Sequence, residues 1–191
     1  MSIPFQFILN IISMCFWIFP FVRQYRTELF WYFLVKGLID PFVVIFNSFS
    51  PYIPISTTMN LLLLLSLNYR ERSKKVVFAF IISCIALLYI SGVSQYSLYY
   101  IRFILIHSVI IYLFFKRTII FSAANRNMNL FHIFLLLEEM STTLKAIFVL
   151  SNIANALAFF YITVIFEFIC ALFFTFYKED DERLHIKLRH D

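Results

Sequence analysis

Residues 3–49 of this chain read IPFQFILNIISMCFWIFPFV (3–22), RQYRTE (23–28) and LFWYFLVKGLIDPFVVIFNSF (29–49). Two long apolar segments thus flank a short polar loop that carries two arginines. A helix needs roughly 20 apolar residues to cross a hydrocarbon core about 30 Å thick, and both segments reach that length. This stretch therefore predicts a pair of transmembrane helices joined by a basic loop.

The rest of the sequence continues this alternation of apolar segments and short loops. The chain of 191 residues is 62% hydrophobic and 14% charged, with a mean hydropathy of +0.84, which leaves too little polar surface for a soluble globule of this size. We therefore predict an all-α fold, an integral membrane bundle of seven transmembrane helices that forms one domain over residues 1–177. The predicted spans are 3–22, 29–49, 52–67, 76–93, 97–115, 128–150 and 154–177.

The basic residues of the loops indicate how such a bundle is oriented. Arginine and lysine occur in the first, third and fifth loops and in the segment 178–191, whereas the other three loops contain none. Because basic loops are retained in the cytoplasm, the pattern predicts an N-terminus outside and a C-terminus inside. The charged tail 178–191 is interpreted as a solvated extension or docking peptide on the cytoplasmic or matrix side, or as a simple stop-transfer flank. The stretch 118–125 is expected to lie along the same interface, beyond the fifth span.

Three side chains near the predicted span ends are expected at the surface of the bundle. Tyr32 and Tyr99 occupy positions typical of interfacial aromatic residues. Arg102 lies some 7 Å below the outer end of the fifth span, at about 1.5 Å per residue, so its side chain is expected to extend to the lipid headgroups.

The sharpest local signal is KGLIDP, residues 36–41 of the second apolar segment. Lys36 and Asp40 are four residues apart and share a helix face. Pro41 cannot donate to the carbonyl of Gly37, so we expect the helix to be broken at these two residues. At about 1.5 Å per residue, Asp40 lies roughly 17 Å deep, near the middle of a bilayer. A broken helix with charged groups at that depth is typical of a substrate or ion site, and a purely structural ion pair is the alternative.

The same depth estimate places further charged residues near that level. We predict that these side chains face one another across the bundle and form an ion, proton or ligand site. A fixed hydrogen-bonded core is the alternative that the sequence leaves open. The predicted set is Lys36, Asp40, His107, Glu138, Glu139, Lys145 and Glu167.

The sequence lacks the residue patterns that several kinds of functional site require. Cys15, Cys84 and Cys170 show no CxxC spacing, so neither a disulfide framework nor a zinc site is indicated. Gly37 and Gly92 are the only glycines, which excludes glycine-rich phosphate loops, and no HxxxH, HExxH or GxSxG string occurs. We therefore predict no enzymatic activity, no metal and no cofactor. Basic residues form no run longer than two, so anionic lipid is a better counterion than nucleic acid.

The function expected from these features is that of a membrane protein with few groups outside its spans. We predict a non-enzymatic integral membrane protein, acting as a sensor-like module or as an assembly subunit of a larger membrane complex. The alternative is a small proton- or ion-coupled transporter with its site around Lys36 and Asp40. The expected partners are the lipid bilayer and other membrane protein subunits. The 26 phenylalanines are typical of an AT-rich genome, so the expected location is a bacterial inner membrane or an organellar inner membrane.

Overall fold

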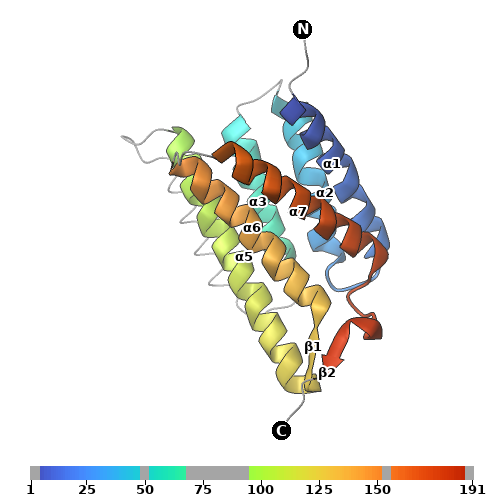
Figure 1. Cartoon of the computed structure of the whole chain (residues 1–191). Helices are drawn as coiled ribbons and strands as arrows, with labels where there is room; N and C mark the ends of the chain where they lie inside the picture. The colour runs from blue at the N-terminus through green and yellow to red at the C-terminus, as the bar shows by residue number, and fades with distance from the viewer. Residues whose placement is uncertain (1–4, 48–51, 68–94, 152–155, 188–191) are drawn as a thin grey trace.

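Six α-helices make up most of the chain that the structure describes. The structure is a computed structural model, and it describes residues 5–47, 52–67, 95–151 and 156–187. Its helices are α1 (Phe5–Arg23), α2 (Phe30–Asn47), α3 (Tyr52–Leu67), α5 (Gln95–Asn125), α6 (Leu130–Leu150) and α7 (Ala156–Phe176) (Figure 1). The remaining elements are a short antiparallel pair of strands, β1 (Asn127–Asn129) and β2 (His185–Lys187), and the 3-10 turn η2 (Glu182–Leu184).

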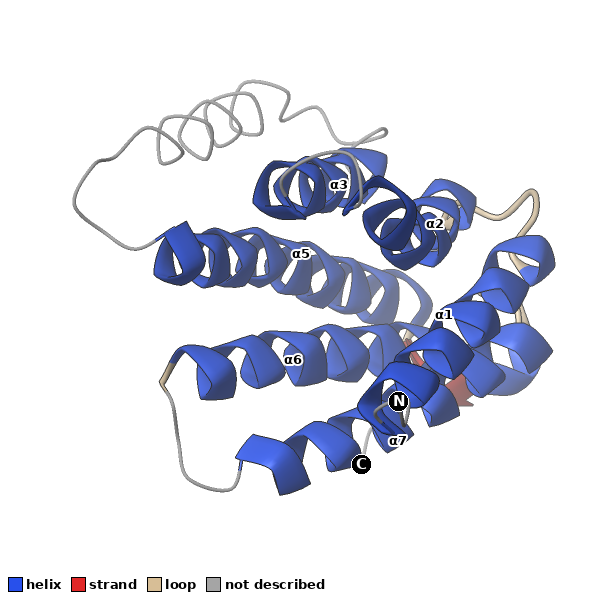
Figure 2. Cartoon of the chain, turned by 90° about the horizontal axis from the view of Figure 1, so that it is seen from above, coloured by secondary structure: helices blue, strands red, loops and turns tan. Residues whose placement is uncertain are grey.

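The six helices form a closed ring around one interior. Each helix contacts the next described helix along the chain, and α7 returns to contact α1. Figures 1 and 2 show α1 beside α7 and α5 beside α6. Helices α3 and α5 run in the same direction, because Ser56 bonds to Tyr99 and Asn60 bonds to His107 in the same order along both helices. Each described helix therefore contributes one face to a shared interior.

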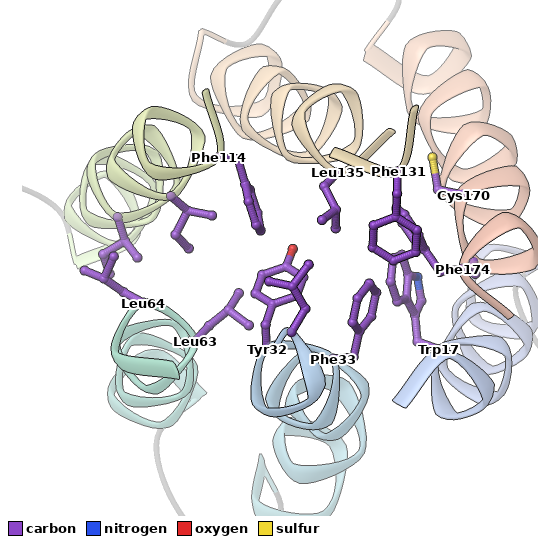
Figure 3. Packing of buried hydrophobic residues seen from close by; sticks show 14 of the residues in the cluster. Trp17, Tyr32, Phe33, Leu63, Leu64, Phe114, Phe131, Leu135, Cys170 and Phe174 are labelled. Atoms are coloured by element: carbon purple, nitrogen blue, oxygen red, sulfur yellow. The ribbon is translucent and has the colours of Figure 1, made fainter. Parts of the chain in front are cut away.

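An aromatic core fills the half of the ring that lies nearest the two strands. Figure 3 shows its side chains pointing inward from all six helices. The ring of Phe174 lies 5.1 Å from that of Phe33 and 5.0 Å from that of Phe131, at angles of 58° and 60°. Such inclined aromatic pairs add about 0.5 to 1.5 kcal/mol each to the stabilisation that comes from burial. The core also includes Trp17, Tyr32, Leu63, Leu64, Ile110, Phe114, Leu135 and Cys170.

Gly37 allows α1 and α2 to pack closely. A Cβ atom added to Gly37 would lie 2.7 Å from the carbonyl oxygen of Trp17, which is closer than side-chain carbons approach backbone oxygens. The predicted break at Gly37 and Pro41 does not interrupt the helix, because α2 continues through both residues to Asn47. Gly37 therefore contributes to helix packing.

The predicted bundle of seven transmembrane helices is wrong. Within the described residues, one helix is long and apolar enough to cross a membrane, α5 over Ser97–Asn125, and a buried helix of a soluble protein meets the same criteria of length and composition. Helix α3 has 16 residues, about 24 Å at 1.5 Å per residue, and α6 carries three charged residues in its interior. The predicted orientation, with the N-terminus outside and the C-terminus inside, depends on seven spans and is therefore no longer supported. The predicted span 76–93 lies outside the described residues.

Three local expectations are also corrected. Helix α5 continues to Asn125 and does not end at residue 115, so the stretch 118–125 is helical. Arg102 is 0% exposed, so its side chain does not extend outward to headgroups. Tyr32 and Tyr99 are 1% and 8% exposed and belong to the interior, not to an interface.

Candidate functional site

A layer of charged side chains lies across the ring, on the side of the aromatic core away from the two strands. Lys36 follows the core residues of α2 by one turn, and Glu138 and Glu139 follow those of α6 in the same way. The structure brings all seven predicted site residues to this region. They are Lys36 and Asp40 on α2, His107 on α5, Glu138, Glu139 and Lys145 on α6, and Glu167 on α7.

Lys36 binds the two adjacent glutamates of α6. Its Nζ donates to Glu138 and, at 2.6 Å, to Oε1 of Glu139. The Lys36 ammonium also lies 4.9 Å from the centre of the Trp17 ring, in cation–π contact. Thr142 donates to the second oxygen of Glu138 at 3.2 Å. Lys36 therefore pairs across the ring with glutamates of α6. It does not pair with Asp40, although Asp40 lies four residues away on the same helix.

Glu139 is the centre of the hydrogen-bonded layer. Besides Lys36, the Tyr32 hydroxyl donates to it, and Nδ1 of His107 lies 2.6 Å from its Oε2. The other ring nitrogen of His107 lies 3.1 Å from Oδ1 of Asn60, whose amide nitrogen is already used to donate to a backbone carbonyl. Both nitrogens of His107 thus face oxygen acceptors.

A second ion pair joins α6 to α7. Nζ of Lys145 lies 3.0 Å from Oε1 of Glu167. Both side chains are partly buried and line the same cavity as Lys36. The pair therefore extends the charged layer to the last helix of the ring.

Asp40 is the one carboxylate of the layer for which the described part of the chain provides no hydrogen bond or ion pair. Its side chain is exposed and lines the central cavity. The other three carboxylates each have a lysine within ion-pair distance, Lys36 for Glu138 and Glu139 and Lys145 for Glu167. Asp40 is therefore the carboxylate of the layer whose negative charge has no ion-pair partner among the described residues.

The cavity has a volume of about 290 Å³ and lies beyond the charged layer. All six described helices contribute to its lining. Its wall combines the charged groups with aromatic side chains, among them Tyr99, Tyr100 and Phe103 of α5. On the opposite side of the charged layer, Phe33 and Phe131 are fully buried in the aromatic core. The core therefore separates the cavity from the end of the molecule that carries the strands.

A second polar cluster fastens the tail to that end. Glu179 accepts hydrogen bonds from Arg117 and, at 3.1 Å, from Nε2 of His132. Gln24 donates to the backbone oxygens of Phe174 and Tyr177 at 3.1 and 2.7 Å and accepts from the Glu179 amide at 3.3 Å. Burial alone raises the pKa of Glu179, but the hydrogen bond from His132 and the charge of Arg117 outweigh it and hold the pKa below its usual value.

A wider cavity of about 810 Å³ opens beside this cluster. Its lining combines charged side chains, among them Arg26, Arg117 and Glu182, with apolar ones such as Leu113 and Phe121. Within residues 5–47, 52–67, 95–151 and 156–187, however, no three His, Cys, Asp or Glu side chains are placed to hold a metal ion, either here or in the central cavity. Neither cavity therefore presents a metal centre.

Sequence reasoning missed several residues of these two clusters. Tyr32 precedes Lys36 by four residues and so shares its helix face, which is a signal that could have placed it in the layer. Asn60 and Gln24 carry no such signal, because their partners come from other helices far along the chain. Their roles become visible only in the folded structure, where the closed ring of helices brings them together with these partners.

Comparison with known proteins assigns no function to this chain, so the function has to be inferred from the geometry of the site. No family model matches the sequence, and neither the curated proteins nor the solved structures provide a significant match.

Proposed function

We propose that this chain is a non-enzymatic, sensor-like module that binds a proton or a small monovalent cation at Asp40 in the central cavity. The single observation that carries the proposal is that Asp40 has no ion-pair partner among the described residues of the layer. Every other charged group there has a partner, while Asp40 faces the cavity without one from the described residues. A carboxylate that lines a cavity without a cationic partner is stabilised either by protonation or by an added cation.

The one-sided cavity favours sensing over conduction. Phe33, Phe131 and Phe174 are packed without exposure between the charged layer and the strands. An ion that enters the cavity therefore meets the aromatic core and does not pass through the ring. Occupancy would instead change the charge balance among the six helices that line the cavity.

The outer surface supports lipid as a partner of this module. Large apolar side chains are exposed on every described helix, whereas His107, Glu138 and Glu139 of the layer are buried. This is the reverse of the usual arrangement in soluble proteins. We propose that lipid covers this surface in a bacterial or organellar inner membrane, without assigning a number of spans. Examples from the six helices are Phe19, Trp31, Leu62, Tyr112, Leu137 and Ile165.

Infrared difference spectroscopy tests the proposal directly. The purified full chain in lipid nanodiscs is brought from high to low pH, and the carboxyl stretching band of newly protonated acids is recorded. We expect one such band to be absent in Asp40→Asn and retained in Glu28→Gln, which removes an exposed carboxylate far from the cavity. Identical spectra for wild type and Asp40→Asn, together with no cation binding that depends on Asp40, would overturn the proposal.

Coupled transport is a second candidate function, and one observation favours it. The layer forms a continuous chain of hydrogen bonds from Glu138 through Lys36, Glu139 and His107 to Asn60. Such chains are suited to the relay of protons. In reconstituted liposomes, a proton-driven flux that the wild type shows and Asp40→Asn lacks would establish transport. A sealed vesicle without such a flux would leave sensing as the function. Membership of a larger membrane complex stays a prediction.

A further inference from the structure

We infer that the ligand of the central cavity is a small organic ammonium ion that docks its charged group on Asp40. This inference rests on the proposed function, since it names the cation that Asp40 is proposed to bind. Four features of the described residues point to this chemical class: the single unpaired charge of Asp40, the absence of a metal centre, the aromatic wall and the volume of the cavity.

The unpaired carboxylate selects a monocation. Asp40 carries one negative charge without an ion-pair partner among the described residues, so a divalent ion would overcompensate that charge. The described residues include no group of three metal-ligating side chains, so a bare inorganic ion would have to keep most of its water. An ammonium group requires fewer coordinating side chains, because its N–H bonds donate directly to one carboxylate.

The layer already holds an ammonium group in the way proposed for the ligand. The Nζ of Lys36 is bound by carboxylates and lies 4.9 Å from the centre of the Trp17 ring and 5.3 Å from that of Tyr32. Carboxylate together with aromatic rings is the environment that recognises alkylammonium ions in proteins. On the cavity side, Asp40 is accompanied by Tyr100 and Phe103 in the same wall.

The volume limits the size of the ligand. Ligand pockets in proteins commonly measure about 300 to 1,000 Å³, and this cavity of about 290 Å³ lies at the lower end of that range. A primary amine with one short chain or one ring is therefore the appropriate size, and a peptide is too large. The apolar part of such an amine would lie against the aromatic wall while its charge meets Asp40.

Titration calorimetry on the full chain in nanodiscs tests this inference, with benzylammonium as the probe. Benzyl alcohol serves as its neutral analogue, and potassium as the inorganic monocation. We expect benzylammonium to bind, and its affinity to fall roughly tenfold or more in Asp40→Asn, since a hydrogen bond to a charged group is lost. Glu28→Gln should bind as the wild type does. Equal binding of benzyl alcohol, or full displacement by equimolar potassium, would overturn the inference.

A measurement on the wild type guards against a variant that fails to fold. Addition of benzylammonium at low pH should abolish the infrared carboxyl band assigned to Asp40, because the ligand requires the ionised form. If the band exists and benzylammonium leaves it unchanged, the inference about the ligand is wrong and the proposed proton site stands. If neither the band nor binding is found, both the inference and the proposed function are wrong.

Discussion

At the scale of single residues, Glu139 concentrates the donors of the interior on one buried carboxylate. Tyr32 and His107 bind it from α2 and α5, and Lys36 is shared between Glu139 and its neighbour Glu138. Hydrogen bonds to an ionised acceptor are about twice as strong as neutral ones, but only while every partner is present. The layer therefore constrains the three helices strongly and tolerates the loss of a partner poorly.

Replacement of Lys36 by methionine should destabilise the fold strongly. Lys36→Met leaves Glu138 and Glu139 buried without their shared cation, and breaking a buried ion pair in this way costs about 3 to 5 kcal/mol. Thermal unfolding of the full chain at neutral pH measures the loss. Lys187→Met, which removes an exposed lysine from β2, is the matched control and should change stability little. Equal melting temperatures for the two variants would contradict this assignment of Lys36.

At the scale of elements, the tail is fastened to the end of the ring. Strand β2 pairs with β1 with Met128 opposite Ile186, and η2 lies directly before it. The side chain of Asn129 accepts from the amide of Phe131 at the start of α6 and donates to the carbonyl of Glu179 at 3.1 Å. Residues 178–187 are thus held at this end of the ring by buried Glu179 and Leu184 and by the pairing of β2 with β1.

This attachment should weaken in acid. The pKa of Glu179 is lowered in the folded state, so its contribution to stability is complete above the unfolded value of about 4.3 and is lost as the pH falls through the lower folded value. Hydrogen exchange of the β2 amides should accelerate across that range. Glu179→Gln should exchange faster already at neutral pH and show less pH dependence. Glu182→Gln, an exposed neighbour, should behave as the wild type, and acceleration in Glu182→Gln alone would contradict the role of Glu179.

The packing of α1 against α2 should be sensitive to a single methyl group at Gly37. In an open helix, Gly→Ala stabilises by roughly 0.5 to 1 kcal/mol. Here the added Cβ would lie 2.7 Å from the Trp17 carbonyl oxygen, so the helices must move apart, at a cost of about 1 to 3 kcal/mol. Gly37→Ala should therefore lower the melting temperature. An increase would show that the contact is looser than the structure indicates.

At the scale of the whole molecule, polar and apolar regions alternate along the ring. The Glu179 cluster occupies one end, the aromatic core follows, and the charged layer and its cavity come next. Large apolar side chains cover the outside over the whole length. The charged layer is therefore confined between an aromatic core and an apolar exterior, which keeps its interactions strong.

The two tryptophans provide a test of the proposal that lipid covers the outer surface. Trp31 is 54% exposed and Trp17 is 6% exposed, so only Trp31 should contact lipid. In nanodiscs made with brominated lipid, the fluorescence of the Trp17→Phe variant, which keeps Trp31, should be strongly quenched. The Trp31→Phe variant should be quenched far less. Equal quenching of both would contradict the arrangement of the ring.

Much of the candidate site could be predicted from the sequence, but its pairings could not. A rise of 1.5 Å per residue places Asp40, Glu138 and Glu167 at similar distances from the ends of their helices. Side chains at similar distances along neighbouring helices lie at the same level of a bundle. Lys36 had a carboxylate one turn away on its own helix, yet its partners lie on α6, because the closure of the ring decides which charges meet. The apolar outer face of each helix also raises the mean hydropathy of its segment. This is why the sequence predicts seven spans where one described helix qualifies.

The distance along the chain between Lys36 and its acidic partners has a consequence for synthesis. Glu138 follows Lys36 by 102 residues, so at roughly 5 to 20 residues per second a ribosome needs about 5 to 20 s to produce it. During that interval the ammonium group of α2 has neither of its two carboxylates. The nascent first half of the protein must therefore keep this lysine hydrated until the translated chain reaches α6.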